Sequence, residues 1–382
     1  MNKKKLNVVQ LHSVIFKGDA VSNIMLAIDK INKENNWSSS LIADLFSEYK
    51  GIPVWASADY NKSSYISGIP YLISRFIRLD NKTKWLKEYL NAKKEYKPNV
   101  ARNLIEKADI RIWHYGAFYT LFRYFHERDI LFYHGITYPY LGYNSEFNIY
   151  SKTMLQSILD MNPFVIVQSQ FIKQSIADLG FKSNNIYILP LFHKYKLPYQ
   201  ERYTKPIHLI SWGRYALNKG IPELVRACNQ YKIPIRIFGD NYQTREFKDE
   251  YREALRFNVN NYATLSSKID DFENELNPAT IYISNSHHEG FGMPLIEAEA
   301  HSLPVLVRKG TAMDELVKDG YNGYLFKDIN EIPELINKIK KNYKQISYNA
   351  WKHSQGFSYE NFKKQYLKII NKYLEYKKTN IK

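Results

Sequence analysis

The chain has 382 residues, 45% of them hydrophobic, which is enough for two domains that each bury a core. Its single cysteine excludes an internal disulfide, and no apolar run reaches the ~18 residues of a membrane-spanning helix. The formal net charge of +16 favours anionic partners. No zinc-finger spacing or RNA-binding aromatic motif accompanies that charge, so we expect an anionic membrane surface or a phosphorylated acceptor and no nucleic acid.

The chain is expected to open with a strand, a glycine loop and a helix. Residues 6–12 are largely apolar and predict a strand, and we read the basic residues before them as its lead-in and not as a signal peptide. A loop with Gly18 follows, and a helical pattern then runs to Asn35. This arrangement is typical of phosphate sites, although the Gly-Lys-Ser/Thr ending of a P-loop is missing. Gly18 is therefore a candidate phosphate contact.

Residues 68–97 combine aromatic side chains with many cations. Trp85, Leu86, Tyr89 and Leu90 share one face of a predicted helix. One hypothesis is that this face docks on an anionic membrane. The alternative is a surface helix that packs this face on its own domain.

Three short apolar runs, residues 110–114, 130–134 and 164–168, alternate with helical patterns. Such alternation predicts a mostly parallel sheet. His114 and His134 each stand at the end of a predicted strand, and ligands of open parallel sheets bind beyond the carboxyl ends of the strands. Both histidines are therefore candidate site residues. The alternative is that backbone groups satisfy their ring nitrogen atoms.

A second strand–loop–helix pattern begins with the apolar residues 207–212. Gly213, Arg214 and Lys219 follow, before a helix that Pro222 opens. A planar guanidinium and a compact ammonium beside a helix start suit the charge of a diphosphate. The alternative is a pair of solvated cations beside a turn.

The third strand–loop–helix pattern gives the strongest indication of a binding site. Residues 279–284 are apolar and β-branched and predict a buried strand, and Pro294 fits the first turn of the helix that follows. Between them, the sequence Glu289-Gly-Phe-Gly lets the backbone approach a ligand closely. Glu297 lies eight positions after Glu289, one acid in the loop and the other on the helix. The combination predicts an anion site with two carboxylates, and the alternative is an ordinary turn with solvated acids.

This spacing resembles the Glu-x7-Glu signature of the retaining glycosyltransferases of family GT4 (glycosyl transferases group 1). The resemblance implies an α/β protein of the GT-B fold, in which two Rossmann-like domains face each other across a cleft. The Gly213–Lys219 segment resembles the family's Gly-Arg…Lys-Gly motif, and residues 133–139 resemble its first-domain histidine loop.

The pattern breaks near residue 190, and the polar, aperiodic residues 193–205 predict the linker. We expect an acceptor-binding domain over residues 1–192, joined by the C-terminal helix 360–382. Residues 206–359 are expected to bind the nucleotide sugar.

The resemblance also implies roles for single residues. His134 and Glu289 would be catalytic, with Glu289 on the sugar hydroxyls. Acceptor contacts would come from His114 and Thr137. The donor-binding residues would be Gly18, Gly213, Arg214, Lys219, Phe291, Gly292, Met293 and Glu297.

The implied reaction moves a sugar, with retention at the anomeric carbon, from a nucleoside-diphosphate sugar to a glycan or lipid-linked acceptor. Such a reaction belongs to the synthesis of bacterial surface polysaccharide or glycolipid, in the cytoplasm and on the inner face of the membrane. No Asp-x-Asp occurs, so we expect no metal and no cofactor besides the donor substrate. The alternative is a non-catalytic subunit of the same fold that binds a nucleotide sugar or a glycan.

Overall fold

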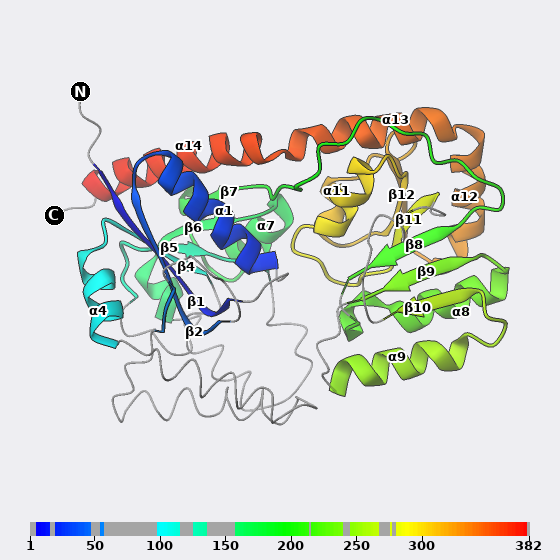
Figure 1. Ribbon diagram of the computed structural model, residues 1–382, viewed down its shortest axis with the longest axis horizontal. Coiled ribbons are helices and arrows are strands. Elements are labelled where there is room, and N and C mark those ends of the chain that lie inside the picture. Colours follow the sequence, from blue (N-terminus) through cyan, green and yellow to red (C-terminus); the bar gives the residue numbers. More distant parts are fainter. Residues whose placement is uncertain are drawn as a thin grey trace. The chain divides into compact units, whose positions relative to one another are not determined.

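The computed structural model describes residues 5–15, 20–46, 54–56, 98–114, 125–135, 157–213, 215–239, 245–266, 276 and 280–379 (Figure 1). The chain divides into two compact units. The first comprises Met1–Gln168, Ile172–Leu189 and Lys363–Lys382, and the second comprises Ser169–Phe171 and Pro190–Phe362.

The first unit is built on a sheet whose described strands are all parallel and run in the order β3-β2-β1-β4-β5-β6-β7. The central strands are apolar runs buried on both faces, as expected of a parallel sheet covered by helices. The strands are β1 (Asn7–Ile15), β2 (Ser38–Phe46), β3 (Val54–Ala56), β4 (Ile110–His114), β5 (Ile130–Phe132), β6 (Phe164–Val167) and β7 (Ile186–Ile188).

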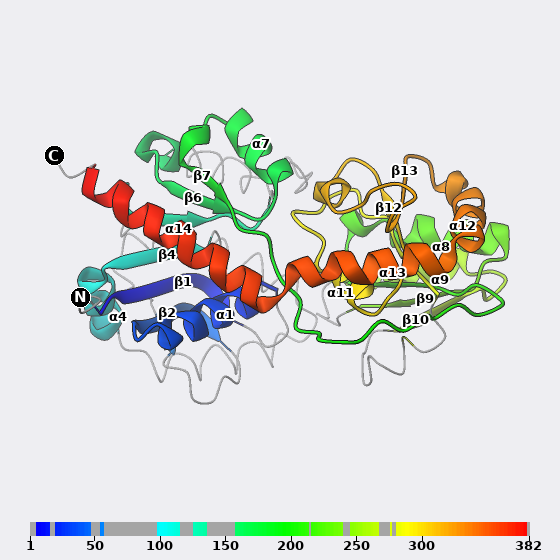
Figure 2. The same cartoon turned by 90° about the horizontal axis from the view of Figure 1, so that it is seen from above.

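Among the described residues, four α-helices belong wholly or in part to this unit: α1 (Ala20–Glu34), α4 (Pro98–Lys107), α7 (Gln170–Asp178) and α14 (Tyr359–Thr379). From Lys363 onward α14 crosses the first sheet (Figure 2). The Tyr373 ring meets Phe164 of β6 at 5.4 Å between centroids, and the Tyr366 hydroxyl donates to Asn32 of α1 at 3.1 Å. The end of the chain is therefore part of the first unit's core.

The second unit has a parallel sheet in the order β10-β9-β8-β11-β12-β13. Counted along the chain, this is the order 3-2-1-4-5-6 of a doubly wound nucleotide-binding sheet, and six strands of the first sheet share it. The prediction of two Rossmann-like units is confirmed. The strands are β8 (Leu209–Trp212), β9 (Ile235–Phe238), β10 (Ala263–Ser266), β11 (Ile281–Ser284), β12 (Val305–Arg308) and β13 (Gly323–Phe326).

Helices cover both faces of this second sheet. In Figure 1, α8 (Ile221–Tyr231) and α9 (Arg245–Phe257) lie on one side, and α11 (Met293–Ala300) and α13 (Tyr343–Ser354) lie on the other. The helix α12 (Ile332–Lys341) adds apolar residues to the core. The short helices in the described part of the chain are η4 (Leu217–Lys219), η5 (Ala312–Glu315), η6 (Ile329–Glu331) and η7 (Gln355–Phe357), with η3 (Ser183–Asn185) in the first unit.

The segment 193–205, expected as a linker, lies within Pro190–Phe362, the main part of the second unit. Trp351 donates to the Leu197 carbonyl at 2.9 Å, and Arg202 donates to the His301 carbonyl at 2.9 Å. The rings of Tyr199 and Tyr203 also pack on this unit, at 6.2 Å from Trp351 and 5.0 Å from Tyr343 between centroids. The expected boundaries at 192, 206 and 360 therefore differ from the observed divisions at 189 and 362.

No described helix is both long and apolar enough to cross a membrane. The proposed membrane-docking segment, residues 68–97, lies outside the described residues, as do Gly18, Thr137 and Arg214.

Candidate functional site

The candidate donor site lies where the strand order of the second sheet reverses, between β8 and β11. Trp212 ends β8, and the loop from Asn285 to Gly292 follows β11. Ligands of such sheets bind in the crevice beyond these strand ends. The topology thus brings the second and third sequence motifs, about 70 residues apart in the chain, to one place.

Lys219 and Glu289 form an ion pair beyond these strand ends. Their side chains are 16% and 17% exposed, and Ser286 donates its hydroxyl to the same Glu289 oxygen at 3.2 Å. The residue expected to hold phosphate and the residue expected to hold sugar therefore contact each other. An anion bound here would compete with Glu289 for the ammonium group.

Two asparagines hold the Lys219 loop against the loop after β11. Asn218 donates to the His288 carbonyl at 3.1 Å and accepts from the His287 N–H at 2.7 Å. Asn285 donates to the Gly220 carbonyl at 2.8 Å. Neither asparagine was predicted, because a single amide in a loop has no spacing that marks it.

Gly292 places the backbone at the start of α11. It has φ 110°, a conformation that favours glycine, and a Cβ atom here would lie 2.7 Å from Met313 Cγ. The N–H groups of Gly292 and Met293 precede Leu295, whose N–H donates back to the Gly292 carbonyl at 3.0 Å. These early N–H groups and the helix dipole favour an anion at this end of the helix. Phe291, beside them, is 5% exposed and packs its ring against Phe357.

Glu297 lies on α11 with its carboxylate against Trp212, whose indole N–H donates to it at 3.2 Å. Burial raises the pKa of this carboxyl group to about 7, an effect that the Trp212 bond and Lys194 reduce. A carboxyl group with such a pKa changes charge near neutral pH. Perturbed groups of this kind in a crevice are typical of functional sites.

Gly213 continues from β8 and donates its N–H to the Phe238 carbonyl at 3.1 Å. A Cβ atom on this glycine would lie 3.9 Å from the Lys219 side chain. That is an ordinary van der Waals distance, so the constraint at Gly213 is its φ of 149° and not the space beside Lys219.

In the first unit, His114 and His134 lie at the carboxyl ends of β4 and β5 and are joined to two glutamines. Gln10 contacts His114 Nε2 at 3.1 Å, His114 Nδ1 contacts His134 Nε2 at 2.6 Å, and Gln168 contacts His134 Nδ1 at 2.8 Å. The rings of the two histidines stack at 4.9 Å between centroids. Burial is the main cause that lowers the pKa of each histidine well below 6.5, so both are neutral at pH 7.

The positions of the protons along this row of hydrogen-bonded side chains can be assigned. Gln10 donates its amide N–H to the Met25 carbonyl at 2.9 Å, so its oxygen faces His114 as an acceptor. His114 is therefore protonated on Nε2 and accepts on Nδ1 from His134 Nε2–H. His134 in turn accepts on Nδ1 from the Gln168 amide.

Both nitrogen atoms of His134 are thus engaged within its own unit. Gln168 is 2% exposed, and its oxygen Oε1 has no hydrogen-bond partner in the described part of the chain. The group that offers an unused acceptor at these strand ends is therefore the Gln168 amide and not the imidazole. Gln10 and Gln168 were missed by the sequence analysis, because an isolated glutamine in or after an apolar strand carries no motif.

Residues 197–353 match the model of the family Glycosyl transferases group 1. The capsular polysaccharide biosynthesis glycosyltransferase CapM of Staphylococcus aureus is 26% identical over 217 residues, 54% of this chain and 57% of CapM. Sucrose-phosphate synthase from Thermosynechococcus elongatus has the same fold, with a TM-score of 0.70, 15% identity and coverage of 96% and 99% of the two chains. Anabaena HepE, solved in complex with UDP-glucose, aligns with a TM-score of 0.67, 16% identity and coverage of 96% and 100%.

The fold is GT-B, as the sequence predicted. The resemblance to the glycosyl transferases group 1 family is confirmed over residues 197–353, within the second unit. The chain spans only 22%, 56% and 57% of the length of three curated relatives that it matches, CapM among them.

Proposed function

We propose that this protein is a glycosyltransferase that moves a sugar from a nucleoside-diphosphate sugar, bound by the second unit, to an acceptor. The observation that carries the proposal is the Lys219–Glu289 pair beside the glycine-led start of α11, at the strand-order reversal of the second sheet. The cation and the early helix N–H groups there suit a diphosphate, and the carboxylate suits the hydroxyl groups of a sugar.

In this proposal the charge that develops on the leaving diphosphate is stabilised by a cation and by backbone N–H groups of the second unit. Lys219 would leave Glu289 for the phosphate oxygens, and the N–H groups of Gly292 and Met293 would add to it. Glu289 would accept from the sugar hydroxyls. Arg214, which stands beside this loop in the sequence, would supply a second cation, and no metal or other cofactor would be needed.

Glu297 would bind the ribose hydroxyls through its carboxylate. Two donating hydroxyls stabilise the charged form, so donor binding would lower its pKa from about 7. The Trp212 indole bond would keep the carboxylate oriented.

Retention at the anomeric carbon rests on the Glu-x7-Glu resemblance alone. The first unit would bind the acceptor, with Gln168 and the His114–His134 chain lining its strand ends. The likeness to CapM supports a polysaccharide acceptor. Residues 68–97 would hold the protein on the inner face of an anionic membrane, which co-sedimentation with anionic and neutral vesicles tests.

The test is release of UDP from UDP-glucose and other UDP-sugars, with and without a pool of polysaccharide and lipid-linked acceptors. HepE in complex with UDP-glucose supports UDP-glucose as the first donor. The proposal expects UDP release that requires the acceptor and is lost in Lys219→Ala. Donor binding without release in any acceptor pool would instead support the non-catalytic binding subunit.

A further inference from the structure

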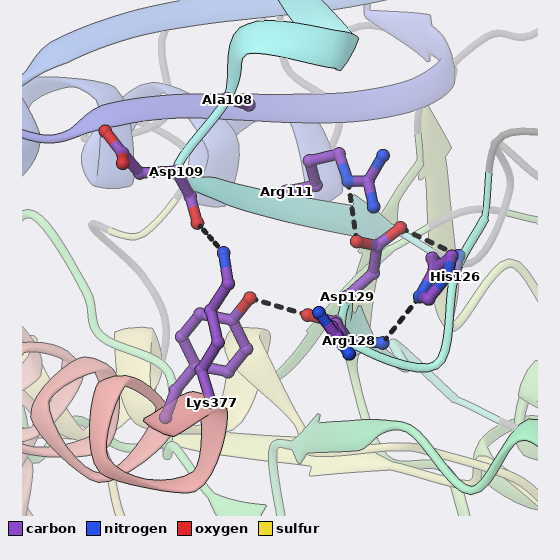
Figure 3. A pocket seen from close by; sticks show the side chains of 8 residues that line it. Ala108, Asp109, Arg111, His126, Arg128, Asp129 and Lys377 are labelled. Atoms are coloured by element: carbon purple, nitrogen blue, oxygen red, sulfur yellow. Dashed lines mark hydrogen bonds and ion pairs between the residues drawn. The ribbon is translucent and has the colours of Figure 1, made fainter. Parts of the chain in front are cut away.

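A polar pocket of about 240 Å³ lies in the first unit, at the amino-terminal ends of β4 and β5. This is the opposite end of these strands from His114 and His134. Figure 3 shows its walls: the loops that lead into the two strands, and the last turns of α14. The glycosyl-transfer proposal assigns no role to these residues.

Both carboxylates of the pocket are already occupied. Asp129 is 1% exposed, and it accepts from Arg111 at 2.6 Å and from the His126 N–H at 3.0 Å. Asp109 accepts from the Asn7 N–H at 2.9 Å, and Figure 3 shows its carboxylate turned away from the pocket's lysine.

The cations of the pocket have fewer partners than the carboxylates. Lys377 donates to the Asp109 carbonyl at 2.7 Å and has no carboxylate within ion-pair distance in the described part of the chain. Arg128 has its Nε atom buried and without a hydrogen-bond partner among the same residues. Arg111 uses its Nε atom on Asp129. Three cations therefore stand against two acids.

Burial is the main cause that lowers the pKa of Lys377. The nearby acids Asp109 and Asp129 oppose this effect, whereas Arg111 and Arg128 add to it. The ammonium group is therefore in a place where water stabilises it poorly and where like charges crowd it. A buried donor without a partner and a crowded cation both gain from an added anion.

We propose that this pocket binds a phosphate group, either free or carried by a larger molecule. Phosphate provides up to two negative charges and several acceptor oxygens, which match two guanidinium groups and one ammonium group better than a single carboxylate would. A phosphate here would join the loops before β4 and β5 to α14. It would therefore strengthen the attachment of the C-terminal helix to the first sheet.

The experiment is calorimetric titration of inorganic phosphate at constant ionic strength, with wild type, Arg128→Gln, Lys377→Gln and Lys219→Ala. The matched control is Arg102→Gln, because Arg102 is an exposed residue of the same unit that pairs with Glu106 at 2.8 Å. We expect the Arg128 and Lys377 variants to bind phosphate at least about tenfold more weakly, the scale of a lost charge-assisted hydrogen bond. Arg102→Gln and Lys219→Ala should retain this site.

The Lys219→Ala variant separates this inference from the proposed donor site. If phosphate binding disappears in Lys219→Ala and persists in both pocket variants, the phosphate binds in the second unit and the pocket proposal is wrong. Unchanged affinity in Arg128→Gln also overturns it. Circular dichroism confirms folding, and Arg128→Lys, which keeps the charge, should recover part of the affinity.

Two further arms identify the source of the phosphate. Glycerol phosphate tests a soluble ester, and vesicles with phosphatidic acid test a lipid headgroup. Binding that Arg128→Gln weakens in either arm supports the pocket and names its ligand class. Absence of such binding in both arms and with inorganic phosphate overturns the proposal.

Discussion

The ammonium group of Lys219 contacts the carboxylate of Glu289, although the two residues stand in different loops of the second unit. This pairing has a consequence for binding, because Glu289 competes with any phosphate for Lys219. We therefore expect Glu289→Gln to bind free UDP at least as tightly as wild type while it transfers sugar more slowly. Calorimetry with UDP and a transfer assay measure the two effects. Weaker UDP binding in this variant would show that Glu289 supports the phosphate site.

Glu297 should make stability depend on pH. Its pKa is about 7 in the folded protein and 4.5 ordinarily, so between these values the unfolded chain releases a proton that the folded protein keeps. The free energy of unfolding therefore falls as pH rises through this window, by up to about 3 kcal/mol. Glu297→Gln should remove this fall and weaken UDP binding. Urea unfolding at pH 5 and pH 8 measures the change in the free energy of unfolding. The same pH dependence in wild type and in Glu297→Gln would show that Glu297 is not its cause.

The histidine chain predicts a defined proton arrangement. Nitrogen NMR of the imidazole groups should show His114 and His134 neutral at pH 7 and both protonated on Nε2. Because the pKa of each is lowered from 6.5, the unfolded chain takes up protons first as pH falls, and the first unit should lose stability below about pH 6.5. Protonation of either ring on Nδ1 at pH 7 would contradict the chain.

Gln10 fixes that arrangement, so its loss should be costly. Gln10→Leu leaves the buried His114 N–H without an acceptor and should destabilise the protein by about 1–3 kcal/mol. The control is Gln174→Leu, since Gln174 is an exposed residue of α7 whose partner is Asp178. Equal stability of the two variants in urea unfolding would show that Gln10 does not hold the histidine.

Gly292 should tolerate no side chain. Gly292→Ala combines a left-handed backbone with a Cβ atom 2.7 Å from Met313 Cγ and should destabilise the protein by about 1–3 kcal/mol. Gly356→Ala is the matched control, because a Cβ atom there would meet nothing within 4 Å. The test fails if the two variants unfold at the same urea concentration.

Strand–helix alternation and motif spacing were enough to predict the two Rossmann-like units and the place of Lys219, Glu289 and Glu297. Each of these residues lies in a loop or helix start whose glycines and prolines mark it in the sequence. The parallel order of the strands then brings the loops together.

Other features depend on contacts between distant positions and leave no local pattern. Gln10 meets His114 from a strand more than 100 residues away, and Gln168 reaches His134 from the residue that follows β6. The segment 193–205 was read as a linker because its sequence is largely polar, although Trp351 binds the Leu197 carbonyl and the ring of Tyr203 packs on Tyr343. Side-chain pairing of this kind appears only once the fold is known.

The central claim is that the second unit binds a nucleoside diphosphate through Lys219. Its most direct test is calorimetric titration of UDP and UDP-glucose into wild type, Lys219→Ala and the control Lys340→Ala, whose exposed lysine lies on α12. We expect Lys219→Ala to weaken binding by about 1.5–3 kcal/mol, the scale of a charge-assisted hydrogen bond, and Lys340→Ala to bind as wild type does. If Lys219→Ala binds UDP as tightly as wild type, the donor site is not at this crevice.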